Sequence, residues 1–131
     1  MLKDAEYIRI PEGVPIVQSF LNAIVTLRTE ELEQMLSGFA AQKGYALNDD
    51  EAVYFAAEVP ESDPEYFGDR GVAVYRCRPA EDRLTVVLMD EHDFWFRATD
   101  VILQRGGEFP PERFAVLKEH LKEWYRRMRN R

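Results

Sequence analysis

Apolar residues recur at helical spacing in the first third of the chain. Between 15 and 27 they lie on most sides of the predicted helix, which indicates that this helix is largely buried. The helix begins near Pro15, because proline is tolerated in a first helical turn. A second helix begins at Thr29, the expected N-cap, and we expect it to end at Lys43 and Gly44.

The same spacing returns in the last third of the chain. Asp90 is expected to cap a third helix that runs to about Arg105 and ends at Gly106 and Gly107. A fourth helix begins at Pro111 and continues for about 20 residues, which makes it ~30 Å long.

Between these helical parts, three segments have the composition of strands: 52–59, 72–78 and 84–89. The last of them is apolar on both faces, which predicts a central strand. The short link RPAED before it suits an antiparallel hairpin. Residues 5–10 are a further candidate for a short strand.

This order of elements, ααβββαα, predicts an α+β fold. We expect a small antiparallel sheet of about three to four strands, packed with about four helices on at least one face. The 131 residues fit a single domain spanning 1–131, and they contain no internal repeat and no linker long enough to separate domains.

Cysteine usage and the N-terminal residues point to a compartment. Cys77 is the one cysteine, so no disulfide forms within the chain. The start, MLKDAEYIRI, lacks the apolar stretch of a signal peptide, and no run approaches the ~18 apolar residues of a membrane span. These features predict a cytoplasmic protein that has no membrane partner.

The distribution of charge says more than the net charge of −7. Residues 118–131 hold six bases and two acids, for +4, whereas the first 117 residues hold 11 bases and 22 acids, for −11. The acidic segment, as we call residues 44–69, contains no lysine or arginine. Its acids are Asp49, Asp50, Glu51, Glu58, Glu61, Asp63, Glu65 and Asp69. Such a surface repels nucleic acid and attracts basic proteins.

Residues able to carry out catalysis are few. His92 and His120, the only histidines, fall on different predicted helices. Cys77 alternates with Tyr75 and Ala73 along a strand, which is typical of a buried core cysteine rather than of a nucleophile. We therefore expect no catalytic residues.

Sequence motifs for metals, cofactors and phosphates are lacking as well. The run 90–93 holds metal-binding residue types, but an ordinary helix start explains Asp90 and Asp93, and no second cluster supplies further ligands. No phosphate-binding loop, nucleophile elbow or zinc-protease spacing occurs. We expect neither a metal nor a cofactor.

Four bases on the predicted C-terminal helix, Lys118, Lys122, Arg126 and Arg129, form a stripe beside its apolar face. Nucleic-acid or membrane-surface binding is one interpretation. The other is that bases favour the negative end of a helix dipole and cover the edge of the core with their stems. We favour the second, because the rest of the protein is negative.

Two aromatic residues, Tyr66 and Phe67, lie among the carboxylates of the acidic segment. Aromatic anchors surrounded by charge are typical of protein-binding hot spots. Alternatively, the two rings attach the loop to the core. The sequence leaves both interpretations open.

Residues 66–131 resemble the small immunity proteins of contact-dependent growth inhibition systems, particularly the ribonuclease-toxin immunity family. The resemblance rests on Gly71-Val72 opening a strand, on the strand LTVVLM, on the acidic helix start DEHDFWF, and on the terminal FPPERFAVLKEHLKEWYRRM. It implies a non-catalytic cytoplasmic protein that binds a cognate toxin domain, often a basic nuclease, and blocks its active site or substrate channel.

The expected toxin-binding surface combines the acids of the segment, its two aromatic residues and a secondary patch at the start of the third helix. These residues are Asp49, Asp50, Glu51, Glu61, Asp63, Glu65, Tyr66, Phe67, Asp69, Asp90, Glu91 and Asp93. An adaptor or regulatory module with another basic partner is the alternative, and a small hydrolase is a more distant one.

Overall fold

The computed structural model describes all residues from Met1 to Arg131. Its helices are α1 (Val14–Ile24), α2 (Thr29–Ala40), α3 (Glu91–Gln104) and α4 (Pro111–Arg129). Its strands are β1 (Ala5–Arg9), β2 (Tyr45–Ala46), β3 (Glu51–Phe55), β4 (Val72–Arg78) and β5 (Arg83–Met89). Short 3-10 turns span Ala56–Glu58, Pro79–Glu81 and Gly106–Glu108. The α+β class predicted from the sequence is confirmed.

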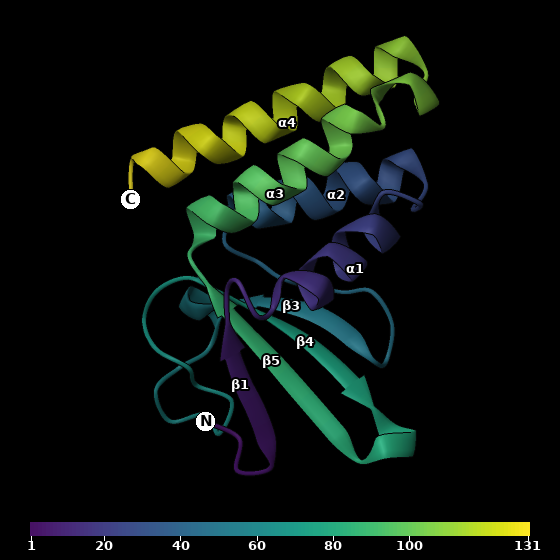
Figure 1. Cartoon of the computed structure of the whole chain (residues 1–131). Coiled ribbons are helices and arrows are strands. Elements are labelled where there is room, and N and C mark those ends of the chain that lie inside the picture. Colours follow the sequence, from purple (N-terminus) through teal and green to yellow (C-terminus); the bar gives the residue numbers. More distant parts are fainter.

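The five strands form one sheet in the order β1-β5-β4-β3-β2. Neighbouring strands are antiparallel except β1 and β5, which are parallel, so the prediction of a purely antiparallel sheet is wrong. The physical reason is visible in Figure 1: both strands run toward the helices, because β1 leads into α1 and β5 leads into α3. The candidate strand at 5–10 exists as β1, and β2 is too short to show a period in the sequence.

Several element ends differ from the sequence-based expectation. Strand β3 ends at Phe55 rather than at 59, because Glu58 Oε1 accepts hydrogen bonds from the backbone N–H groups of Phe55 (2.8 Å) and Gly44 (2.7 Å) and so closes a turn. Helix α2 ends at Ala40, where Gln42 rather than a glycine takes the left-handed conformation (φ 57°). The N-cap of α2 is Arg28 rather than Thr29, and Asp90 is the N-cap of α3 as expected; neither side chain makes a capping hydrogen bond.

The main core lies between the helices and one face of the sheet. It contains 24 buried residues, against four in the cluster on the other face. The rings of Phe39, Phe94 and Trp124 meet at its centre, with the Phe39 and Trp124 centroids 5.2 Å apart. Full burial stabilises each such side chain by about 1.5–3 kcal/mol. This helical layer is therefore the main source of stability.

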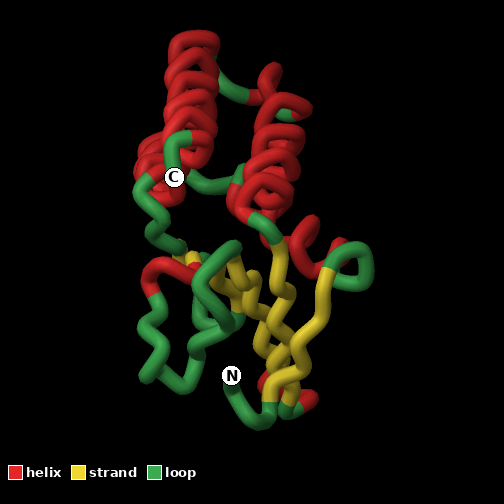
Figure 2. The backbone as a smooth tube through the Cα atoms, turned by 90° about the vertical axis from the view of Figure 1, so that its left-hand side faces the viewer, coloured by secondary structure: helices red, strands yellow, loops and turns green.

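The other face of the sheet carries no helix. Figure 2 shows the helices gathered at one end of the molecule and loop segments lying beside the strands. Tyr75 and Leu88 are buried on this second face, and Phe67 packs against them from the loop 59–71. The acidic segment therefore lies partly over a small, separate core. None of the four helices has both the length and the apolar character needed to cross a membrane.

Candidate functional site

The carboxylates of the acidic segment stand out because they have no partners of opposite charge. None of its eight acids forms an ion pair, whereas ten of the other sixteen acids in the chain do. The paired acids are Glu6, Glu30, Glu31, Glu33, Glu81, Glu91, Asp93, Glu108, Glu119 and Glu123. The lack of bases in the sequence of this segment is therefore matched by a lack of ion pairs in the fold.

The first cluster of predicted site residues occupies the turn between β2 and β3. Asp49 and Asp50 are exposed, and Glu51 is partly buried. The backbone holds this turn in place, because the carbonyl of Asp50 accepts a hydrogen bond from the N–H of Cys77 (2.7 Å). Arg76 lies opposite Glu51 in the sheet register and lines the same small hollow. The fold thus places a base near this end of the acidic segment.

The second cluster lies in the loop 59–71, on the uncovered face of the sheet. The Asp63 carboxylate accepts a hydrogen bond from the N–H of Glu65 (2.8 Å), and its carbonyl accepts one from the N–H of Tyr66 (3.0 Å), so the loop has a defined turn. Asp63 and Glu65 are partly buried, whereas Glu61 and Asp69 are exposed. None of these four carboxylates forms an ion pair.

The two aromatic residues of this loop have different positions. Phe67 packs against the small core on the second face, so it attaches the loop to the sheet. Tyr66 is partly exposed and does not belong to that core. Tyr66 is therefore the better candidate for a contact with a partner.

The last residue of the loop, Gly71, must be a glycine, because a Cβ atom there would lie 2.5 Å from the carbonyl oxygen of Met89.

Sequence reasoning missed a tyrosine beneath this loop. Tyr75 is buried on β4, and its hydroxyl has no hydrogen-bond partner. Burial raises the pKa of Tyr75, and the negative charge of Glu65 raises it further. The alternation along 73–77 indicated a buried face here, but an unpaired hydroxyl depends on what the loop brings over it and has no sequence signal.

The secondary patch at the start of α3 does not act as one group. Glu91 is turned inward: its carboxylate accepts a hydrogen bond from Trp124 Nε1 (2.9 Å), forms an ion pair with Arg131 and contacts Gln42 Nε2 (3.4 Å). Asp93 forms an ion pair with Arg97 (3.1 Å). Both carboxylates are engaged within the fold, which leaves Asp90 as the free member of the patch.

Asp90 lies next to the acidic segment in space, although 21 residues separate it from Asp69. The two side chains line one open hollow, together with Arg70 and Arg131. The fold therefore brings one residue of the secondary patch to the acidic segment, and it places bases in the same hollow.

The residues considered for catalysis, Cys77, His92 and His120, lie on three different elements, β4, α3 and α4. Cys77 is partly exposed, so its prediction as a core residue is wrong; it lies near the end of β4, where it is paired with Leu84 of β5. His92 lies on α3 beside the rings of Trp95 and Tyr125, at centroid distances of 6.0 Å. No group of three or more His, Cys, Asp and Glu side chains is arranged to hold a metal ion.

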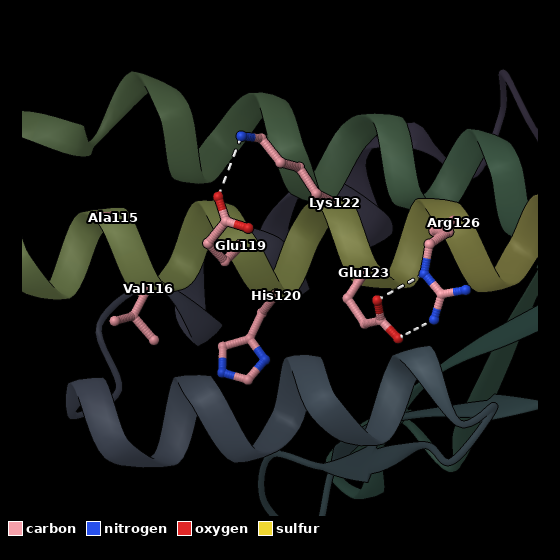
Figure 3. Close-up of a pocket in the computed structure, with 7 residues that line it drawn as sticks. All are labelled: Ala115, Val116, Glu119, His120, Lys122, Glu123 and Arg126. Carbon is pink, nitrogen blue, oxygen red and sulfur yellow. Dashed lines mark hydrogen bonds and ion pairs between the residues drawn. The ribbon is translucent and has the colours of Figure 1, made fainter.

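A shallow hollow on α4, shown in Figure 3, is lined by residues of that helix alone. Its charges pair along the helix: Lys122 Nζ lies 3.2 Å from Glu119 Oε1, and Arg126 donates two hydrogen bonds to Glu123. Hydrogen bonds from Arg126 and Arg127 lower the pKa of Glu123 to about 2. His120 is the one imidazole here, and Figure 3 shows it pointing toward α2. This hollow offers no uncompensated charge.

Searches of protein-family models, of curated proteins and of solved structures find no match to this chain.

Proposed function

We propose that the protein binds a basic protein partner through the acidic segment, and that this partner is a toxin domain which binding neutralises in the cytoplasm. The observation that supports the proposal is the contrast in ion pairing: none of the eight acids of the segment forms an ion pair, whereas ten of the other sixteen acids of the chain do. Carboxylates held without counter-charges repel one another, so a basic surface that approaches them gains favourable energy.

A nuclease is the kind of toxin that this chemistry suits best. A nuclease carries a basic surface for its phosphate-rich substrate, and carboxylates can take the positions that phosphates would occupy. Complementary charge also accelerates the encounter, toward ~10⁸ M⁻¹s⁻¹ or more at low salt. Neutralisation of this kind requires binding alone and no chemical step by the inhibitor.

The proposed contact surface follows the geometry of the two clusters. The loop 59–71 supplies Glu61, Asp63, Glu65, Tyr66 and Asp69. Asp90 lies beside this centre, in the hollow that Asp69 lines, whereas the β2–β3 turn, with its three acids, lies at the opposite end of β3. Glu91 and Asp93 are left out of this surface because their carboxylates are used inside the fold.

The first experiment is co-purification with the product of the neighbouring gene, followed by an assay of that product's toxic activity with and without this protein. Binding together with loss of activity supports the proposal. Binding that leaves the activity intact would point to an adaptor, and a failure of any basic protein to bind would overturn the proposal.

Charge reversal then tests the surface. The triple variant Asp63→Lys, Glu65→Lys and Asp69→Lys should slow association at least tenfold at low salt, because steering depends on the local potential. A matched control reverses three exposed acids outside the segment that form no ion pair, Asp4, Glu12 and Glu112, and so changes the net charge equally. Equal effects of the two triple variants would show that only total charge matters and would refute this surface.

A further inference from the structure

The hydroxyl of Tyr75 is an unsatisfied polar group on the second face of the sheet. The residue is only 7% exposed, and its hydroxyl has no hydrogen-bond partner. A buried hydroxyl without a partner is unfavourable, and such groups are rare in folded proteins. Tyr7, on the same face, has a partner, because its hydroxyl accepts a hydrogen bond from the N–H of Leu2 (2.7 Å). The fold therefore satisfies the hydroxyl of Tyr7 and leaves that of Tyr75 without a partner.

Aromatic rings pack around the side chain of Tyr75. The ring of Tyr54 meets that of Tyr75 edge to face, with centroids 5.1 Å apart at 78°. Phe67 and Tyr7 pack against the same small core. A cation is attracted to the faces of such rings, and the attraction is stronger where water is excluded.

Two carboxylates complete the arrangement. Asp63 and Glu65 are partly buried in the loop 59–71, and neither forms an ion pair. The same loop carries Phe67, which packs against the cluster that contains Tyr75, and the charges of Glu65 and Asp63 raise the pKa of the Tyr75 hydroxyl. Partly buried carboxylates are normally paired, since removing a charge from water is costly. The Tyr75 hydroxyl and the two carboxylates can therefore all accept hydrogen bonds, and none of them has a cationic donor as a partner.

We propose that Tyr75, Asp63 and Glu65, with the rings of Tyr54 and Phe67, form a receptor for a single arginine side chain of the basic partner. Its guanidinium donates hydrogen bonds to the Tyr75 hydroxyl and to the two carboxylates. Arginine suits the receptor better than lysine, because its planar group has five donors and stacks on aromatic faces.

Access to this receptor is through the loop. Tyr54, Asp63, Glu65 and Tyr66 are all partly exposed, so the cluster is reachable although Tyr75 is covered. The backbone turns at Gly68 (φ 127°), where a side chain would meet nothing within 4 Å. A small outward movement of the loop admits the guanidinium. This inference rests on the proposed function only in naming the source of the arginine.

The direct test uses N-acetyl-arginine amide as the probe and the ¹⁵N- and ¹³C-labelled full chain as the receptor. Titration to millimolar concentrations should shift NMR signals of Tyr75, Tyr54 and the loop 59–71. N-acetyl-citrulline amide, the uncharged analogue, should not shift them. Equal shifts with both probes, or shifts spread over all surface acids, would overturn the proposal.

Variants sharpen this test without disturbing the fold. Tyr75→Phe removes an unpaired hydroxyl, so its melting temperature should be equal to or above that of the original protein, while its affinity for the arginine probe falls about tenfold, which is ~1.4 kcal/mol. Glu65→Gln should have a similar effect on affinity. Glu112→Gln, at an exposed acid of α4 that forms no ion pair, is the matched control and should leave the affinity unchanged. Unaltered affinity in Tyr75→Phe and Glu65→Gln would refute the receptor.

The two proposals fail separately. If the purified toxin partner binds Tyr75→Phe and Glu65→Gln as tightly as the original protein, while the triple charge reversal abolishes binding, the acidic surface stands and the receptor is refuted. If no basic protein binds but the arginine probe still shifts Tyr75, the receptor stands and the proposed function falls.

Discussion

The acidic segment and helix α4 are both densely charged, yet they differ in whether their charges form ion pairs. In α4, Glu119 pairs with Lys122, and Glu123 pairs with Arg126 and Arg127. In the acidic segment no carboxylate forms an ion pair. We therefore base the proposed binding surface on the absence of ion pairs rather than on charge density alone.

Backbone geometry explains the contrast. A helix places residues three and four apart on one side, so acids and bases at that spacing meet without help from the rest of the fold. The turns of the acidic segment offer no such spacing, and the segment contains no base. The carboxylates of Glu119 and Glu123 in α4 are therefore engaged in ion pairs within the helix, whereas the carboxylates of the acidic segment remain available to a partner. The predictions below separate these two roles.

The largest expected effect is on the helical layer. Trp124 is fully buried, packs on Phe39 and donates a hydrogen bond to Glu91. Trp124→Ala should lower the free energy of unfolding by about 3–5 kcal/mol, measured by urea denaturation. A loss below about 1 kcal/mol would mean that this layer is not the main source of stability. The triple reversal in the acidic segment should cost far less.

The next largest effect is on stability, and it should distinguish two neighbouring acids: Glu91, whose carboxylate is engaged inside the fold, and Asp90, whose side chain is exposed. Glu91→Ala should cost about 2 kcal/mol, because its carboxylate, only 12% exposed, accepts hydrogen bonds from Trp124 and Arg131. Asp90→Ala, the matched control, should change stability by less than about 0.5 kcal/mol, since Asp90 is exposed and forms no ion pair. Thermal and urea unfolding of both variants checks this. Similar losses in both would contradict the inward role of Glu91.

A pH titration examines the compensated charges of α4 directly. The Glu123 carboxyl should titrate with a pKa of about 2, and Arg126→Gln with Arg127→Gln should return it toward the ordinary value near ~4.3. Because the folded pKa is the lower one, the stabilising contribution is present above about pH 4.3 and is lost as the pH falls toward 2. Carboxyl ¹³C NMR measures the pKa, and an unchanged value in the double variant would exclude the arginines as its cause.

The smallest effect is expected in the acidic segment itself. Replacing Asp49 and Asp69 with Asn and Glu61 with Gln should raise the free energy of unfolding by a few tenths of a kcal/mol at low salt, because like charges repel. The gain should vanish at 1 M salt, where the Debye length is about 3 Å. Thermal unfolding at the two salt concentrations measures it. A loss of stability at low salt would show that these acids are compensated after all.

The sequence predicted the elements with strong periodicity more accurately than the connections between them. The four helices and the strands at 72–78 and 84–89 lie close to where their apolar patterns placed them. The two-residue strand β2 and the early end of β3 were missed, because they depend on Glu58, whose carboxylate binds backbone groups of two different segments. Such a contact between distant parts of the chain has no local pattern.

The residues of the candidate site can likewise be separated into those that the sequence identified and those whose role only the tertiary structure decided. Composition alone identified the acidic segment, because its lack of bases is a property of consecutive residues. The inward turn of Glu91, the proximity of Asp69 to Asp90 and the unpaired hydroxyl of Tyr75 were decided by tertiary structure. Local sequence sets periodicity and charge, since both act between near neighbours along the chain. Whether a polar group finds a partner depends on which distant segments the packing of the core brings beside it.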